Sequence, residues 1–560
     1  MANCPVIVPY FVFVVKERIG EEGGEGGENK RLLLWNKSNI QVDRRRIKRY
    51  NPAMKTTLRT LLLALIFVLP SFGNEVSIVP DAKPVEYNRM IFGQFIEHFH
   101  RQIYGGIFEP GSPLSDKDGF RTDVIKALRE LKIPIVRWPG GCFVSSYHWL
   151  DGTGPNRQPA YDKAWGVEDP NTFGTVEFVK WCKLIGAEPF ICTNAGTGTP
   201  EEMSDWVEYC NLNIGKYGRL RKSHGIEEPL NVKYWSVGNE NWGGHEIGAK
   251  TVAEWGPLVR ESAKMMKNTD PSIKLFAAAT DNEGWTLPLL QNAGRHLNYV
   301  SIHGYWDGLW MNNTGSPYLA CMMRTEQPAG AIAKTITILE KAKLRGKVKI
   351  AFDEWNLRGW HHPEFPGGSA DKNRIVDRDK NDINSTYTMA DALFSACFLN
   401  TCLRNCGDVE IGGFSPIVNT RGALFVHPKG IVKRTTFYVL QLYADKLEKN
   451  VLPVTVKSEP LVSGKQSVPV LDVIVTTNDA KTKFVIAAVN KSPDKAVELA
   501  LAAELQSRSG KVAATVLSGA SPDDFNDIGA ENRVVPETKT LEIKAGKVSL
   551  PAHSLVILAL

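Results

Sequence analysis

A buried strand is expected at Val232-Lys-Tyr-Trp-Ser-Val-Gly-Asn-Glu240, where an apolar run ends on an amide and a carboxylate. A second segment, Lys349-Ile-Ala-Phe-Asp-Glu354-Trp, has the same form. Continuous apolar runs are typical of parallel strands that are buried on both faces. Eight such runs are present, at 92–98, 135–142, 188–195, 232–240, 275–281, 299–306, 348–355 and 409–419.

Amphipathic segments separate these runs. They include Val124–Leu131, a helix beginning at Thr199-Pro-Glu-Glu202, the segment 247–266 and a segment from near Lys433. Strand–helix alternation over residues 91–448 predicts an α/β fold, a (β/α)8 TIM barrel. A doubly wound open sheet has the same alternation and remains the alternative. The polar residues at the strand ends favour the barrel, because its active sites lie at the carboxyl ends of the strands.

The pattern changes after residue 448. Residues 449–560 contain short alternating runs separated by turn residues, which predicts a C-terminal antiparallel β-sandwich domain. Its strands are expected at 468–477, 483–490, 496–501, 512–517, 541–544 and 548–560. The N-terminal segment 74–90 is expected to add a strand to this sandwich.

The N-terminal end predicts processing and export. The chain has 560 residues and a net charge of +6. Residues 1–53 carry a surplus of four positive charges, and Lys55 and Arg59 supply the other two, so residues 74–560 carry none. This balance gives no reason to expect a nucleic-acid partner. Residues 1–53 are interpreted as a leader outside the mature protein, with translation starting at Met54.

Residues 54–73 have the basic start, short apolar run and small-residue exit of a signal peptide. A secreted or periplasmic protein is therefore expected, with no membrane attachment after signal cleavage. A buried strand or a membrane anchor is the alternative for this segment. The nine cysteines lie at irregular intervals, and most are interpreted as small buried side chains.

Glu240 and Glu354 are the candidate catalytic residues. In a closed barrel they end strands four and seven, which face each other across the mouth. Two carboxyl groups about 5 Å apart are what a retaining glycosidase needs, one as the acid and one as the nucleophile. Burial and mutual repulsion are expected to separate their pKa values. The alternative is that each glutamate pairs with an arginine at a strand end.

Several motifs resemble those of a known family and occur in the same order along the chain. They are Phe92-Gly-Gln-Phe-Ile-Glu-His98, Ile103-Tyr-Gly-Gly-Ile107, Arg137-Trp-Pro-Gly-Gly-Cys142, Tyr147-His-Trp-Leu-Asp-Gly-Thr-Gly-Pro155, Trp235-Ser-Val-Gly-Asn-Glu240, Phe352-Asp-Glu-Trp355 and Leu550-Pro-Ala-His-Ser-Leu555. From about residue 76 to the C-terminus, the chain resembles glycoside hydrolase family 51, which consists mainly of α-L-arabinofuranosidases.

The resemblance implies a role for each matching residue. Glu240 would be the general acid/base and Glu354 the nucleophile. Asn239 would hold the 2-hydroxyl of the sugar, Glu97 other hydroxyls, and Trp165 would form an aromatic wall. Arg137 and Tyr305 would contact the nucleophile. His303 and Cys142 are further candidates for substrate binding, although Cys142 fits equally well as a buried thiol without a sugar contact.

Two positions depart from the pattern of the family. Arg358 stands where some members have a tryptophan, a role that Trp360 could take over, and Pro416 stands where some have a glutamine that contacts the sugar. These changes affect the leaving-group side and one sugar contact, and they leave the carboxylate pair intact.

The expected reaction is retaining release of terminal α-L-arabinofuranosyl groups from an arabinose-containing plant or algal polysaccharide or oligosaccharide, such as arabinoxylan or arabinan. No cofactor and no metal is expected, because the carboxylates supply the chemistry. The rivals are an endo-acting β-glucanase or xylanase on the same scaffold and a non-catalytic carbohydrate-binding protein. The family resemblance also implies a homo-oligomer. His361-His362 and the segment 377–382 are interpreted as solvated loops and not as metal sites.

Overall fold

The computed structural model describes residues 73–309, 314–359, 382–506 and 510–560. The predicted leader 1–53, and the predicted signal segment except its last residue, lie outside the described residues. Trp360, His361-His362 and nearly all of the segment 377–382 also lie outside them. Among the described helices, none is long and apolar enough to cross a membrane.

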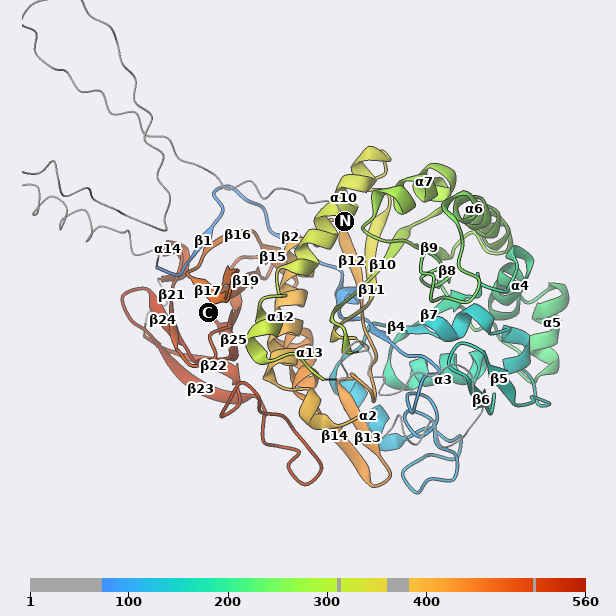
Figure 1. The fold of residues 1–560 in the computed structure, drawn as a ribbon, viewed down its shortest axis with the longest axis horizontal. Helices are drawn as coiled ribbons and strands as arrows, with labels where there is room; N and C mark the ends of the chain where they lie inside the picture. Colours follow the sequence, from blue (N-terminus) through green and yellow to red (C-terminus); the bar gives the residue numbers. More distant parts are fainter. Residues whose placement is uncertain (1–72, 310–313, 360–381, 507–509) are drawn as a thin grey trace, which may run out of the picture. The chain divides into compact units, whose positions relative to one another are not determined.

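Eight parallel strands form a closed barrel, as the sequence predicts (Figure 1). They pair in chain order, and the last strand closes onto the first through Phe414 and Gln94. The seventh strand continues beyond its predicted end at Trp355 to Arg358, because it stays paired with the sixth strand up to Asp307. The strands are β3 (Gln94–Phe95), β4 (Ile135–Trp138), β7 (Glu188–Thr193), β8 (Tyr234–Val237), β9 (Lys274–Ala278), β10 (Tyr299–Asp307), β11 (Lys349–Arg358) and β12 (Val409–Phe414).

A layer of buried side chains fills the barrel near the amino ends of its strands. Phe276 on β9 stacks between Phe190 and Tyr299, with ring centroids 4.3 Å away on both sides. The layer consists of Ile135, Phe190, Tyr234, Phe276, Tyr299, Ala351 and Ile411. Because this end is packed with apolar groups, the polar residues that follow along the strands lie toward the other end.

Helices surround the barrel (Figure 1). Helix α6 (Val252–Thr269) begins later than the predicted residue 247, because Thr251 and Glu254 form a capping box that fixes its start. Thr199 caps α4 (Pro200–Asn211), as its sequence predicts. The others are α2 (Thr122–Glu130), α3 (Thr175–Ile185), α5 (Gly215–Ser223), α7 (Glu283–Ala293), α9 (Tyr318–Met322), α10 (Gln327–Lys341), α12 (Met389–Arg404) and α13 (Thr435–Lys446).

Two sheets form the C-terminal sandwich. In an order in which neighbouring strands are hydrogen-bonded, one sheet contains β16 (Val454–Lys457), β1 (Glu75–Ile78), β21 (Val497–Ala500) and β24 (Lys547–Leu550). The other holds β2 (Val85–Glu86), β15 (Asn450–Leu452), β19 (Leu471–Thr477), β20 (Phe484–Asn490), β25 (Ser554–Ala559), β22 (Gly510–Leu517) and β23 (Glu537–Ile543). Three separate pairs of short strands form hairpins: β5 (Ala160–Asp162) with β6 (Val167–Asp169), β13 (Leu424–His427) with β14 (Gly430–Lys433), and β17 (Pro460–Ser463) with β18 (Gln466–Pro469). Helix α14 (Ala503–Gln506) is a single turn.

The predicted strand 548–560 is wrong, because it divides into β24 and β25 in different sheets. The chain turns at Pro551, which has no N–H to continue a ladder. His553 holds the turn, with its ring nitrogens 2.8 Å from the carbonyl oxygen of Pro493 and 3.0 Å from that of Gly519.

The two faces of the seven-stranded sheet pack in two different apolar clusters. On β20, Val485, Ala487 and Val489 pack in the same apolar cluster as the barrel helices α12 and α13. The intervening Ile486 and Ala488 pack in the cluster between the two sheets. This alternation is the expected period of a strand with two apolar faces. Seven of the eight described cysteines are also buried, and none of the eight forms a disulfide.

Candidate active site

Glu240 follows a sharp turn at the carboxyl end of β8. Gly238 has φ +72°, and a Cβ there would lie 2.0 Å from Oδ1 of Asn241, so the turn requires glycine. Glu240 itself has φ +43°. Its carboxylate lies between two imidazole rings, with Nδ1 of His303 2.8 Å from Oε1 and Nε2 of His245 2.8 Å from Oε2. Both oxygens of Glu240 are therefore held in place.

Glu354 lies on β11 and is 6% exposed. Arg137, buried at the end of β4, donates from NH1 to Oε2 at 2.9 Å. Tyr305 on β10 donates its hydroxyl to Oε1 at 2.6 Å. That hydroxyl also accepts from Arg421 at 2.8 Å and contacts Oγ of Ser415 at 2.7 Å. The carboxylate is thus oriented by a guanidinium from β4 and a phenol from β10, and the phenol is itself held by residues that follow β12.

The two glutamates approach each other across the barrel mouth. One oxygen of Glu240, one oxygen of Glu354 and a ring nitrogen of His303 all lie within 4.8 Å of one another. The pairing of β10 with β11 places His303 directly beside Glu354. The separation is that of a pair in which one carboxylate can attack a carbon while the other serves its leaving oxygen.

The proton distribution differs from the simplest expectation for an acid and a nucleophile. Burial alone would raise the pKa of Glu240, but the hydrogen bonds from His245 and His303 lower it well below its ordinary value. Burial alone would lower the pKa of His303, but Glu354, Asp353 and Glu240 raise it to about 10. The proton near Glu240 is therefore held largely by the imidazole of His303.

Asn239 connects the two halves of the site. Its Oδ1 accepts from NH2 of Arg137 at 2.6 Å and from the backbone N–H of Gly141 at 3.2 Å. Its Nδ2 donates to Oε1 of Glu246 at 2.7 Å, and Oε2 of Glu246 accepts from Ser145 at 2.8 Å. The amide is 1% exposed, so this network fixes its orientation.

Glu97 and Trp165 form a third side of the site. Oε1 of Glu97 accepts from the backbone N–H of Phe143 at 3.0 Å and from Nε1 of Trp165 at 2.9 Å. Burial, and then repulsion by Glu354, raise the pKa of Glu97 well above its ordinary value. Cys142 begins the short helix Cys142–Ser146 after β4, is half-buried, and lies beside Glu246. The structure thus brings together every predicted site residue around one carboxylate pair.

Comparisons with known proteins show the family of this chain. The family described as Alpha-L-arabinofuranosidase 1 domain matches residues 127–320, and the Alpha-L-arabinofuranosidase C-terminal domain matches residues 353–554. The chain is 34% identical to alpha-L-arabinofuranosidase C of Emericella nidulans over 514 residues, 86% of this chain and 96% of that protein. The chain belongs to glycoside hydrolase family 51, the α-L-arabinofuranosidases.

Two further relatives of this arabinofuranosidase are informative. An intracellular exo-alpha-(1->5)-L-arabinofuranosidase of Acetivibrio thermocellus is 33% identical, covering 74% of this chain and 85% of that protein. The crystal structure of an alpha-L-arabinofuranosidase from Thermotoga maritima in an arabinose complex is similar with a TM-score of 0.75 and 31% identity, covering 87% of this chain and all of that chain. The barrel with its antiparallel sheet domain is therefore the fold of the family.

The departures at Arg358 and Pro416 have different consequences in this arabinofuranosidase. Arg358 is 2% exposed and forms ion pairs with Asp307 and with Asp391, at 3.0 Å in the second case. It therefore stabilises the end of β11 and does not replace an exposed aromatic wall. Pro416 follows Ser415, whose hydroxyl contacts the hydroxyl of Tyr305, which in turn donates to Glu354.

Sequence reasoning missed three residues of the arabinofuranosidase site. His245 and Glu246 lie in the loop that follows Glu240, and Arg421 lies beyond β12 with its guanidinium 4.6 Å from the ring centroid of Tyr305. A histidine and an acid five and six residues after Glu240 were the available signal for the first two. Nothing in the local sequence distinguishes Arg421 from a surface arginine.

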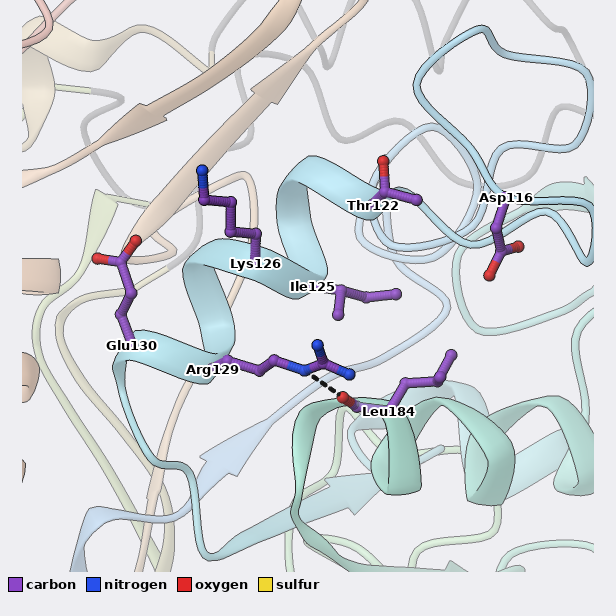
Figure 2. Close-up of a pocket in the computed structure, with 7 residues that line it drawn as sticks. All are labelled: Asp116, Thr122, Ile125, Lys126, Arg129, Glu130 and Leu184. Atoms are coloured by element: carbon purple, nitrogen blue, oxygen red, sulfur yellow. Dashed lines mark hydrogen bonds between the residues drawn. The ribbon is translucent and has the colours of Figure 1, made fainter.

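A separate hollow of about 540 Å³ lies against the outer helices (Figure 2). Five residues of α2 line it together with Asp116 and Leu184, and Nε of Arg129 donates to the backbone oxygen of Leu184 at 2.7 Å. None of the residues around the carboxylate pair lines this hollow. It is therefore separate from the active site.

Proposed function

We propose that this arabinofuranosidase removes terminal, non-reducing α-L-arabinofuranosyl groups with retention of configuration. The observation that carries the proposal is the placement of oxygens of Glu240 and Glu354 within 4.8 Å of each other. Retaining glycosidases hold their carboxyl groups about 5–5.5 Å apart, and inverting enzymes leave about 6.5–9.5 Å for a water.

The first step forms a bond between an oxygen of Glu354 and the anomeric carbon. The bond from that carbon to the leaving oxygen breaks, and the leaving oxygen takes the proton held between Glu240 and His303. Arg137 and Tyr305 keep Glu354 oriented for the attack through their hydrogen bonds to its two oxygens. The product of this step is an arabinosyl ester on Glu354.

The second step releases the sugar. Glu240 takes a proton from a water, whose oxygen attacks the anomeric carbon and displaces Glu354. Asn239 and Glu97 would bind hydroxyls of the sugar. Their own hydrogen bonds leave the amide and carboxylate fixed before substrate arrives, so little ordering is needed on binding.

Arabinoxylan, arabinan and their oligosaccharides are the proposed substrates. The arabinose complex of the Thermotoga maritima relative supports an arabinose-containing substrate. The name of the Acetivibrio thermocellus relative, which specifies exo action on α-(1→5) linkages, supports release of terminal groups. An endo-acting glucanase or xylanase on this scaffold remains the rival.

The stereochemical course can be followed directly by proton NMR. Hydrolysis of a 4-nitrophenyl α-L-arabinofuranoside should first yield α-arabinofuranose, which then equilibrates in solution. Initial formation of the β anomer would overturn the retaining mechanism. Incubation with arabino-oligosaccharides and with β-glucan tests the substrate, since cleavage of β-glucan without release of arabinose would favour the endo-acting rival.

We also propose that the enzyme is exported after translation from Met54 and removal of residues 54–73. The support is the sequence pattern alone. Mass spectrometry of the protein from its native host should find no peptides from residues 16–45. Their detection in the mature protein would contradict this start site.

A further inference from the structure

Three different metal-binding side chains converge beside the acid/base. A sulfur of Cys142, a ring nitrogen of His245 and a carboxylate oxygen of Glu246 all lie within 4.8 Å of one another. Cys142 comes from the loop after β4, and His245 and Glu246 come from the loop after β8. None of the steps proposed for hydrolysis uses this combination of thiol, imidazole and carboxylate.

Hydrogen bonds already orient part of this group. Glu246 is 5% exposed, and its two oxygens accept from Asn239 and Ser145. Hydrogen bonds from outside a metal site commonly orient its ligands in this way. His245 is the adaptable member, because its side chain is 53% exposed, with one hydrogen bond, from Nε2 to Glu240, and an edge contact of its ring with Trp242.

The charge around the thiol favours a cation. The carboxylates of Glu246, Glu97 and Glu240 all act electrostatically on this thiol. The same carboxylates that oppose a bare thiolate would attract a divalent ion. A bound ion reverses this local balance, because it stabilises the thiolate directly.

We propose that Cys142, His245 and Glu246 bind a thiophilic divalent metal ion, with Zn²⁺ as the reference case, at the mouth of the active site. Zn²⁺ takes sulfur at about 2.3 Å and nitrogen or oxygen at about 2.0–2.2 Å, often with three protein ligands and one open position. Binding requires the three donors, which lie within 4.8 Å of one another, to move closer together, and the exposed side chain of His245 is the one free to rotate. Binding forms the Zn–S bond as the thiol proton leaves to solvent.

The bound ion inhibits the enzyme. It draws His245 away from Oε2 of Glu240 and places a positive charge beside the acid/base. It also occupies the side of the site where Cys142 is expected to face the sugar. This second part rests on the proposed function, whereas metal binding itself does not.

Calorimetric titration of the untagged full chain with Zn²⁺ alone tests the site. One ion per chain is expected. Because binding releases the thiol proton to the buffer, the measured heat should change with the ionisation enthalpy of the buffer. The variants His245→Ala and Cys142→Ser should each weaken binding by more than about 100-fold, because removing a residue that only orients a ligand costs about 10–100-fold. His148→Ala is the matched control, because His148 is 47% exposed and pairs with Glu202 at 2.9 Å, as His245 pairs with Glu240.

Cobalt provides a spectroscopic test. Co²⁺ in the intact site should give a near-ultraviolet thiolate-to-metal absorption that disappears in Cys142→Ser and persists in His148→Ala. Binding that is unchanged in both site variants would overturn the proposal, as would the lack of any binding to the intact chain.

The inhibitory role is tested on the same protein. Zn²⁺ should slow release of arabinose from an aryl arabinofuranoside, a chelator should reverse the effect, and free arabinose should weaken zinc binding. Binding at the predicted residues without inhibition would overturn the inhibitory role alone. A chain that binds zinc but cleaves no arabinofuranoside would instead contradict the proposed function.

Discussion

Glu240 is the residue on which the protonation of the site depends. Its carboxylate contacts His303 and His245, and the pKa shifts of Glu240 and His303 run in opposite directions. Because the folded-state pKa of His303 is raised to about 10 from 6.5, its protonation stabilises the folded protein below pH 6.5. That contribution is lost as the pH rises through about 10.

This arrangement predicts an unusual alkaline limb for the reaction. The rate constant kcat/KM should fall only when the Glu240–His303 pair loses its proton, which places the limb well above pH 6.5 and toward pH 10. In His303→Asn the imidazolium is lost, and the limb should move to lower pH, into the range of a buried carboxyl. The exposed His148 gives the control variant His148→Asn, and equal limbs in all three proteins would contradict the assignment.

Azide separates the roles of the two glutamates. In Glu354→Ala, azide can enter where the nucleophile was, so an aryl arabinofuranoside should yield the β-arabinosyl azide. In Glu240→Ala, azide should replace water in the second step and yield the α-azide. The Glu240 variant should lose about 10²–10⁴-fold in rate on a sugar leaving group and far less on an activated aryl group. NMR of the products gives the configuration of each azide. An α-azide from Glu354→Ala and a β-azide from Glu240→Ala would mean that the two glutamates have the opposite roles.

The sequence identifies the charged centre of the site better than its surroundings. Glu240 and Glu354 can be found because each ends an apolar run that predicts a strand. Arg421 cannot be found in this way, since only the packing of the last barrel segment brings it to Tyr305. His245 is local in sequence, but its contact with Glu240 depends on how the intervening loop turns.

The turn after β4 shows how an element constrains the site. Gly141 has φ +73°, and a Cβ there would lie 2.3 Å from the carboxylate of Glu97. Its N–H also donates to Asn239. We expect Gly141→Ala to displace Glu97 and Asn239 and to lower kcat/KM strongly, beyond the strain of about 1–3 kcal/mol that this backbone conformation, with φ +73° and ψ −168°, imposes on alanine.

Gly186 provides the matched control for this prediction. It has φ +81° at the end of α3, and nothing lies within 4 Å of a Cβ placed there. Gly186→Ala should therefore lose only the stability that its positive φ costs an alanine, about 1–2 kcal/mol in urea unfolding, while keeping its kcat/KM. Equal activity in the two variants would show that Gly141 is not needed for the geometry of the site.

Elements are predictable where one local signal dominates. The apolar runs of the barrel strands predict their positions well, because both faces of each strand are covered. The start of α6 was missed where the capping box of Thr251 and Glu254 competes with an apolar periodicity that begins earlier. The division into β24 and β25 depends on which sheet each half joins, a tertiary choice that alternation alone does not express.

At the scale of the whole molecule, the sandwich and the barrel share apolar packing. The sequence predicts a boundary at residue 449 from the change in pattern. Across that boundary, Val485 and Ile557 of the sandwich lie in the same apolar cluster as Phe398 of α12. The change in sequence pattern at residue 449 therefore does not separate the apolar packing of the two parts, and the two parts should unfold together.

Asp472 allows that coupling to be measured. It is 5% exposed on β19 and accepts from Asn400 at 2.8 Å and from Arg404 at 2.7 and 2.9 Å, both on α12. Asp472→Ala leaves these barrel donors without their partner and should cost about 3 kcal/mol of unfolding free energy, the lower end for a buried pair because Arg404 is a third exposed. Activity per folded molecule should be unchanged, since the site is built from other residues.

The pH dependence of that loss distinguishes the ion pair from simple packing. Burial alone would raise the pKa of Asp472, but Arg404 lowers it below its ordinary value of 3.8. Its contribution is therefore present above pH 3.8 and is lost as the pH falls through the lowered pKa of the folded state. The difference in unfolding free energy between the native chain and Asp472→Ala, measured in urea, should be constant near neutral pH and should become smaller in acid. Two separate unfolding transitions in the native chain, or a gap independent of pH, would show that this contact does not couple the sandwich to the barrel.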